Sequence, residues 1–303
     1  MRIDADFAAL RDRLCAVVVV PVTPFDAACQ VDWPAFEQHI RWLAGSGLDV
    51  ICINGNASEF YSLSPVEQAR LTAALPMAAG GALAMTGIGY DVETAIAAGR
   101  AAQAAGVGAV MVHHPPHPFV TPEGWTAYHQ AIAEGLPGLG VVAYIRSAAA
   151  TPEAVRALAE RCPNFVGVKY AVPDPLKMAA MIEATPSTRL AWVCGLAELW
   201  APSFWAAGAK GFTSGLANAN PALALNFFEC LQAGDYAAAH DRLRTIRPFE
   251  QMRARHDSGL NVAVVKEAMA QLGLGSRKVR PPSRELMEAE RAEVAAIMES
   301  WKS

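Results

Sequence analysis

The segment FVGVKYAVPD, residues 165–174, is a continuous apolar run that ends near a lysine and is followed by turn-forming residues. Its apolar residues do not alternate with polar ones, which is the pattern of a strand buried on both faces of a parallel sheet. Lys169 is also the first lysine of the chain, and the other five lysines all follow it. The segment therefore predicts a buried strand whose end presents a lysine.

Seven similar runs lie on either side of this segment. They are AVVVVPVTPF (16–25), DVICING (49–55), LAMTGIG (83–89), AVMVHHP (109–115), GVVAYIRS (140–147), LAWVCGL (190–196) and GFTSGLA (211–217). Ala-rich stretches with helix start and stop signals separate them. Eight such units in sequence predict an α/β fold, a closed (β/α)8 TIM barrel. A doubly wound open sheet is the alternative, although no G-x-G-x-x-G follows the first run.

After residue 220 the strand pattern stops, and three segments have helical patterns: 221–246, 261–273 and 283–300. The first should complete the barrel, and the others should form an extension. We therefore predict a barrel over residues 1–232 and a C-terminal helical extension over residues 233–303.

Composition excludes several classes of protein. The net charge is −4 and the pI about 6.0, with both signs interspersed, so nucleic acid is not expected as a partner. The N-terminus lacks the apolar core of a signal peptide, and no apolar run approaches the roughly 18 residues of a membrane span. We expect a cytoplasmic protein that does not contact membranes. The six cysteines are scattered and should be reduced, with Cys52 and Cys194 as small buried hydrophobes.

In a barrel of this type the active site lies at the C-terminal ends of the strands. The ionisable side chains at this level are Glu59, His113, His114, His117, Tyr144, Arg146, Lys169 and Glu198. Lys169 is the most informative of them, because burial removes hydration from an ammonium and favours the neutral amine. A neutral amine is the nucleophile that forms a Schiff base with a carbonyl. The alternative is a structural lysine paired with Glu59 or Glu198.

Two side chains one strand earlier fit the same chemistry. Tyr144 stands at the equivalent height and could shuttle protons, or it could simply cap the barrel. Arg146 could hold a carboxylate bidentately, or form a salt bridge that faces solvent.

The loop GNASEF, which follows the second strand, contains Gly55, Asn56, Ala57 and Ser58. Small residues there let backbone N–H groups approach a substrate carboxylate, although Gly-Asn is also an ordinary turn.

The run HHPPHP, residues 113–118, permits a metal site built from His113, His114 and His117. Adjacent histidines on a strand point to opposite faces, which makes joint ligation awkward. No carboxylate-rich loop supplies the oxygens that a divalent-metal aldolase would need. We therefore expect neither a metal nor an organic cofactor.

These residues together resemble the dihydrodipicolinate synthase / N-acetylneuraminate lyase family of Schiff-base barrels. The matching pieces are PVTPFD (21–26), GNASEFYSLSPVE (55–67), PPHPFVTPEG (115–124), AYIRS (143–147), GVKYAVPD (167–174) and GFTSGLANANP (211–221). The resemblance implies that Lys169 is the Schiff-base lysine and Tyr144 the proton-relaying phenol. It implies that the 55–59 loop takes the carboxylate of a 2-oxo acid, with Thr213 as a further substrate contact. It also implies a homo-oligomer, a tetramer built as a dimer of dimers.

The departures from this family pattern concern the substrate. Synthases of the lysine pathway carry two threonines where Asn56 and Ala57 stand, and a second tyrosine where His117 stands. Arg146 follows Tyr144 by two residues, as in the YNR run of 5-dehydro-4-deoxyglucarate dehydratases, and SEFYSLSP is similar to their GEFFSL. Against these dehydratases, Ala57-Ser58 replaces the usual Thr-Gly, and Tyr170-Ala171 replaces a polar pair.

We therefore expect a lyase that dehydrates or cleaves a 2-oxo-3-deoxy sugar acid, similar to 5-dehydro-4-deoxyglucarate dehydratase. One alternative is a pyruvate–aldehyde condensation such as 4-hydroxy-tetrahydrodipicolinate synthesis. A second is a metal-dependent hydrolase or aldolase that uses the histidines. A third is a non-catalytic 2-oxo acid binding protein, although binding alone would require neither Lys169 nor Tyr144.

Overall fold

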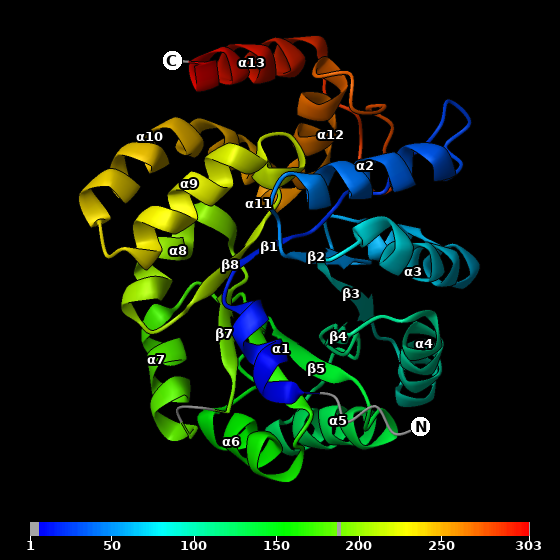
Figure 1. Ribbon diagram of the computed structural model, residues 1–303, viewed down its shortest axis with the longest axis vertical. Helices are drawn as coiled ribbons and strands as arrows, with labels where there is room; N and C mark the ends of the chain where they lie inside the picture. Colours follow the sequence, from blue (N-terminus) through cyan, green and yellow to red (C-terminus); the bar gives the residue numbers. More distant parts are fainter. Residues whose placement is uncertain (1–5, 187–188, 303) are drawn as a thin grey trace.

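Eight parallel strands close into a barrel, in which each strand pairs with the next along the chain and the last pairs with the first (Figure 1). The strands are β1 Val17–Val19, β2 Val50–Ile53, β3 Leu83–Ile88, β4 Ala109–Val112, β5 Gly140–Ile145, β6 Phe165–Tyr170, β7 Ala191–Cys194 and β8 Gly211–Ser214. This computed structural model describes residues 6–186 and 189–302. Residues 1–5, 187–188 and 303, which the predicted domains include, lie outside the described residues. The predicted (β/α)8 barrel is confirmed.

A helix follows each strand and covers the outside of the barrel (Figure 1). These helices are α2 Trp33–Gly45, α3 Pro65–Ala79, α4 Val92–Ala105, α5 Pro122–Gly135, α6 Pro152–Arg161, α7 Pro175–Ala184, α8 Ala197–Ala206 and α9 Pro221–Gln232. Many begin with a capping side chain and then proline; at α3, Ser64 and Glu67 form a capping box before and after Pro65. The caps fix where each helix starts, and so fix the length of the loop at the mouth of the barrel.

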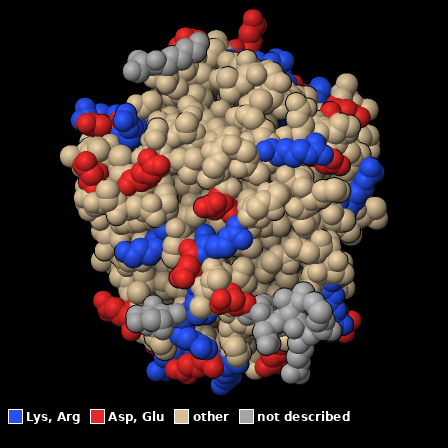
Figure 2. All heavy atoms as spheres, in the orientation of Figure 1, with Lys and Arg blue, Asp and Glu red and all other residues tan. Residues whose placement is uncertain are grey.

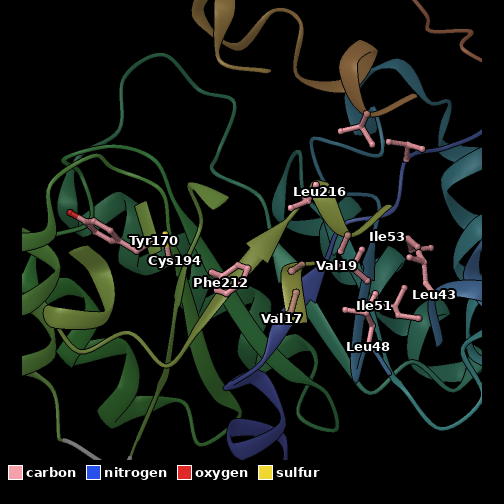
Figure 3. Close-up of a cluster of buried hydrophobic side chains, with 14 of the residues drawn as sticks. Val17, Val19, Leu43, Leu48, Ile51, Ile53, Tyr170, Cys194, Phe212 and Leu216 are labelled. Carbon is pink, nitrogen blue, oxygen red and sulfur yellow. The ribbon is translucent and has the colours of Figure 1, made fainter. Parts of the chain in front are cut away.

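The hydrophobic core has two layers, one inside the barrel and one between the strands and the helices. Figure 3 shows part of the outer layer, where Val17 and Val19 of β1 and Ile51 and Ile53 of β2 lie in one cluster with Leu43 of α2. The residues between these belong to the inner layer, because successive side chains of a strand point to opposite faces. The continuous apolar runs of the sequence thus supply both layers at once.

A helix before the first strand, α1 (Phe7–Leu14), is absent from the sequence prediction. It contacts β6 and β7, and its last residue, Leu14, packs with the inner layer of the barrel. Because α1 leads directly into β1, it covers the N-terminal end of the barrel (Figure 1). Access to the interior is therefore from the opposite end, where the strands finish.

The C-terminal chain forms α10 Tyr236–Arg253, the short α11 Arg255–Ser258, α12 Asn261–Gln271 and α13 Glu288–Glu299. The stretch 221–246, predicted as one helical segment, is two helices, because Gly234 adopts a left-handed φ of 72° and Asp235 caps α10. Helix α10 packs on α8 and α9, and α12 packs on α10 and α13 (Figure 1). The extension therefore lies against the last units of the barrel.

The surface carries charges of both signs, and Figure 2 shows them interspersed over one face of the molecule. Over residues 6–186 and 189–302, no helix is long and apolar enough to cross a membrane.

Candidate active site

Lys169 lies on β6, with its side chain inside the barrel and only 6% exposed. Its neighbours Val168 and Tyr170 pack in the outer layer, so the period of two along the strand turns Lys169 inward. Tyr144 of β5 is its partner in the sheet register, and the Nζ atom of Lys169 lies 4.3 Å from the centroid of the Tyr144 ring. The structure thus brings the two predicted catalytic side chains into contact.

The alternative of a lysine paired with Glu59 or Glu198 does not hold. Glu59 instead accepts a hydrogen bond from the Nζ atom of Lys266 at 2.5 Å, and Glu198 accepts one from the Ser214 hydroxyl at 2.5 Å. Within the described part of the chain, Lys169 forms no salt bridge. An amine that no carboxylate holds is free to attack a carbonyl.

Two further groups place Tyr144. The side-chain amide of Asn56 donates a hydrogen bond to the Tyr144 hydroxyl at 3.2 Å, and the ring of His113 meets the Tyr144 ring edge-on at 6.0 Å. His113 is itself fixed, because its Nε2–H donates to the backbone carbonyl of Asn54 at 2.8 Å and its ring stacks on Phe60. Burial lowers the pKa of His113 to about 4, so this imidazole is neutral at neutral pH.

Gly195, directly after β7, leaves room for the lysine. A Cβ atom at this position would lie 3.0 Å from Cγ of Lys169, 2.9 Å from Cβ of Ala171 and 3.0 Å from the carbonyl oxygen of Tyr170. Any other residue would therefore clash with the Lys169 stem and with the backbone after β6. The sequence analysis does not single out Gly195, although its place at a strand end is a usable signal.

The four predicted loop residues after β2 fall into two pairs. Asn56 and Ala57 line the cavity above Lys169, whereas Gly55 and Ser58 lie behind it. The Ser58 hydroxyl donates to the Pro21 carbonyl at 2.6 Å and accepts from the Gly55 N–H at 3.3 Å, which fixes the turn.

The backbone N–H groups of Asn56 and Ala57 have no acceptor among the described residues. Both residues line the cavity, as a carboxylate-binding loop requires.

The cavity above Lys169 has a volume of about 650 Å³. Tyr144, Arg146 and Thr213 line it together with Lys169. The guanidinium of exposed Arg146 lies 5.8 Å from the centroid of the Tyr144 ring, and the Thr213 hydroxyl donates to the Cys194 carbonyl at 3.4 Å. The volume is within the range of small-molecule sites.

His117, like Gly55 and Ser58, is a predicted site residue that is not part of the cavity lining. It is exposed on the loop after β4, where its Nδ1 atom lies 2.7 Å from the Phe119 carbonyl. His113 and His114 have different environments: the His113 ring is buried and stacks on Phe60, whereas His114 is half-buried. Over the described ranges, no group of three His, Cys, Asp or Glu side chains is placed to hold a metal ion.

The cysteines are free throughout, and the two in strands are inert by environment. Burial raises the pKa of Cys52 to about 12 and that of Cys194 to about 12, so both stay as thiols at neutral pH. They pack as small apolar side chains beside Lys169 and Glu198.

Part of the cavity wall comes from the C-terminal helices. Glu250, Arg253 and Asn261 line the cavity from α10 and α12. These residues could not be predicted from the expectation that the active site lies at the C-terminal ends of the strands. No motif marks these residues in the sequence. They reach the mouth of the barrel only because α10 packs on α8 and α9.

Comparison with known proteins places this geometry in a family. Residues 13–301 match the dihydrodipicolinate synthetase family. The probable 5-dehydro-4-deoxyglucarate dehydratase of Rhizobium rhizogenes is 32% identical over 289 residues, which cover 93% of this chain and 94% of the relative. That of Saccharopolyspora erythraea is 33% identical over 285 residues, covering 92% and 91%.

Two solved structures are similar over almost the whole chain. Dihydrodipicolinate synthase from Oceanobacillus iheyensis superposes with a TM-score of 0.93 at 35% identity, covering 98% of this chain and 99% of that one. The enzyme from Bacillus clausii gives a TM-score of 0.92 at 39% identity, covering 97% and 100%. Relatives named for two different reactions thus share this barrel and its length, and the protein belongs to the dihydrodipicolinate synthetase family.

Proposed function

We propose that this family member is a lyase that forms a Schiff base between Lys169 and a 2-oxo acid, and that it dehydrates or cleaves a 2-oxo-3-deoxy sugar acid. The observation that carries the proposal is the state of Lys169. It is buried at the base of the cavity, contacts Tyr144 and has no carboxylate partner in the described ranges. Burying an amine without a partner lowers the stability of the fold. This cost is expected for a functional group and not for a side chain that only packs.

The chemistry balances without a cofactor. The Nζ atom of Lys169 attacks the C2 carbonyl carbon, and loss of water from the carbinolamine gives an iminium. The iminium accepts the electron pair released when a C3 proton leaves, which forms an enamine. The enamine then expels the C4 hydroxyl, which leaves as water once it is protonated. In the cleavage reaction the C3–C4 bond of the first iminium breaks instead, as the C4 hydroxyl loses its proton and becomes a carbonyl, and the resulting enamine takes up a proton at C3 to give the product iminium. Hydrolysis of the product iminium restores Lys169.

The remaining residues take supporting roles in this proposal. Tyr144 moves the proton between C3 and the leaving hydroxyl, because it is the titratable group that contacts Lys169. The free N–H groups of Asn56 and Ala57 hold the C1 carboxylate, and Arg146 adds positive charge at the rim. Thr213 offers its hydroxyl to the substrate beside Lys169.

Two observations favour a sugar acid. The curated relatives are named as probable 5-dehydro-4-deoxyglucarate dehydratases and match the chain almost end to end. The cavity also has polar walls and room for a hydroxylated chain. The second candidate is a condensation of pyruvate with an aldehyde, favoured by the solved synthases at 35% and 39% identity. The presence of Asn56 and Ala57 in place of the threonine pair counts against it.

The test is reductive trapping. The protein is incubated with pyruvate or with 5-dehydro-4-deoxyglucarate in sodium borohydride, which reduces an iminium to a stable secondary amine. Peptide mass spectrometry should then find the adduct on Lys169. Lys169→Ala should give no adduct, and Lys177→Met, at an exposed lysine of α7, should be trapped like the wild-type protein.

An adduct with the sugar acid, followed by release of water in the absence of borohydride, supports the dehydratase. An adduct with pyruvate and turnover only when an aldehyde is added would favour the condensation instead. A folded protein that gives no adduct with either acid would overturn the Schiff-base proposal.

We also propose that copies of the chain associate. Phe119, two residues from His117 on the loop after β4, is 85% exposed. Tyr61, on the segment after β2, is 55% exposed. Both segments follow strand ends at the mouth of the barrel. Large exposed aromatic side chains often mark a protein interface. Light scattering after size-exclusion chromatography should give a mass above 32.2 kDa, and Phe119→Asp should lower it.

A further inference from the structure

The cavity extends from Lys169 to the C-terminal helices, where Arg253 forms part of its wall. We propose that Arg253 binds the carboxylate at the far end of the substrate, so that the C-terminal extension selects a 2-oxo dicarboxylate over a 2-oxo monocarboxylate. This inference rests on the proposed Schiff base at Lys169. It adds a specificity-determining residue that lies outside the strand-end site.

The guanidinium of Arg253 is buried, 7% exposed, and rigidly held. Its Nη1 atom donates to Glu250, and its Nε and Nη2 atoms both donate to the side-chain oxygen of Asn261, at 3.0 Å and 2.7 Å. These bonds leave one N–H on each terminal nitrogen without an acceptor in the described part of the chain. A fixed guanidinium with two available donors is suited to a carboxylate.

The contact with β8 shows how closely this side chain approaches the barrel. A Cβ atom at Gly215, the residue after β8, would lie 2.1 Å from Nη2 of Arg253. Gly215 therefore admits the guanidinium to the mouth of the barrel. Ser214 and Gly215 line the same cavity as Arg253, so the guanidinium stands beside the strand ends.

The charges around the cavity have an uneven distribution. Arg146 and Arg253 line it as cations, beside the Lys169 amine, and Glu250 and the exposed Asp257 line it as carboxylates. Glu250 is already paired with Arg253.

Glu198 lies behind this wall and bonds Ser214, which lines the cavity. Burial, and then the charge of Glu250, raise the pKa of Glu198 to about 8, so it adds no negative charge at neutral pH. Among the buried groups of this wall, an anionic ligand therefore meets one paired carboxylate, Glu250, and a cation with free donors, Arg253, while Asp257 is exposed to solvent.

The two ends of the cavity fit the two ends of a diacid. The Schiff base must form at Lys169, and the loop for the C1 carboxylate is beside it, because Asn56 bonds the Tyr144 hydroxyl and the Tyr144 ring contacts Lys169. A chain of about six carbons would then extend toward Arg253 across the cavity of about 650 Å³. Buried polar sites discriminate strongly against a ligand that leaves them unpaired.

The test compares two acids that lack a C4 hydroxyl, so that neither can be dehydrated or cleaved once the Schiff base has formed. 2-Oxoadipate and 2-oxohexanoate have the same chain length and differ only in the distal carboxylate. We expect borohydride to trap 2-oxoadipate on Lys169 at a concentration at least about tenfold lower than 2-oxohexanoate, the preference that a charged hydrogen-bonded pair supplies. Equal trapping overturns the inference but leaves the Schiff base intact. Trapping of neither acid overturns the Schiff base, and the inference with it.

The double variant Glu250→Gln/Arg253→Gln removes both charges together and leaves no buried ion unpaired. The ratio of the two trapping concentrations should fall to within about twofold of one. A ratio that stays at the wild-type value would overturn the assignment to Arg253. If the double variant does not fold, Arg253→Lys serves instead, because an ammonium lacks the planar fork and should lower the ratio at least threefold. Arg255→Gln, at an exposed arginine paired with Glu293, is the matched control and should keep the wild-type ratio.

Discussion

Two buried lysines of this protein differ in what surrounds them. Lys266 on α12 is 1% exposed, and its Nζ atom donates to Glu59 at 2.5 Å and to the Lys278 carbonyl at 2.7 Å. It also lies 4.0 Å from the centroid of the Phe25 ring. Lys169 is 6% exposed, contacts the Tyr144 ring and faces a cavity. One ammonium is fully satisfied by the protein, and the other is left to a ligand.

The difference separates a structural lysine from the one that we propose forms the Schiff base. Lys266 joins the C-terminal extension to Glu59, at the end of the loop whose N–H groups line the cavity. Arg280 strengthens the same joint, since its backbone N–H donates to Glu59 at 3.0 Å and its side chain bonds Glu67. The extension thus stabilises the loop that we propose binds the carboxylate. Both lysines are buried, so burial alone does not distinguish them; the absence of a counter-charge at Lys169 is what supports its proposed catalytic role.

The largest expected effect is on catalysis at Lys169. Lys169→Met should lower kcat roughly 10⁴-fold or more, the scale seen when a covalent nucleophile is lost. Its free energy of unfolding should stay the same or rise, because methionine fills the space without an unpaired amine. Turnover assays and urea unfolding measure the two effects. A variant that keeps activity, or that unfolds much more easily, would make Lys169 a structural residue like Lys266.

The opposite outcome is expected at Lys266. Lys266→Met leaves Glu59 buried without its cation, so the free energy of unfolding should fall by about 3–5 kcal/mol. The double variant Glu59→Gln/Lys266→Met should recover most of this loss, because no buried charge then lacks a partner. Urea unfolding of the three proteins checks both values. If Lys266→Met has the wild-type free energy of unfolding, the Glu59–Lys266 ion pair does not stabilise the fold.

A smaller effect is expected at Tyr144. Tyr144→Phe keeps the ring beside Lys169 but removes the hydroxyl that moves protons, so kcat should fall about 10²- to 10³-fold. The adduct on Lys169 should still form under borohydride, only more slowly. His129→Gln, at a buried histidine of α5 far from the cavity lining, is a control for general disturbance of the barrel. Unchanged kcat in Tyr144→Phe would assign the proton transfer to another group.

The smallest effect extends the comparison to carboxylates. Glu59 has Lys266 as its cation, whereas the Oε2 atom of Glu198 has no partner within the described residues. Burial and then Glu250 raise the pKa of Glu198 to about 8. The folded protein therefore binds more protons than the unfolded chain between the ordinary carboxyl pKa and about 8, and stability falls as pH rises through that range.

Glu198→Gln removes this dependence on pH. The variant and the wild-type protein should unfold with similar free energies near pH 5, and the variant should be more stable by roughly 1–3 kcal/mol near pH 9. Urea unfolding across this pH range measures the difference. A constant difference between the two proteins would contradict a neutral Glu198 at low pH.

Much of the fold could be predicted from the sequence, because the signals involved are local. Apolar runs such as 165–171 and caps such as Ser64 act over a few residues, and a parallel strand order follows from their repetition. The two exceptions are instructive. The first is helix α1, whose last residue, Leu14, packs into the inner layer at the N-terminal end of the barrel. The second is the break in the helical segment at Gly234, which depends on a left-handed backbone conformation.

The candidate site divides along the same line. The sequence alone determined which strands carry Lys169 and Tyr144, since period two and strand-end position place both side chains inside the barrel at one level. Only the tertiary structure decided that Lys266 takes Glu59 and leaves Lys169 unpaired, and that Arg253 reaches the cavity from α10. The physical reason is sequence separation: Glu59 and Lys266 are 207 positions apart, and a contact over that distance leaves no periodic trace in the chain.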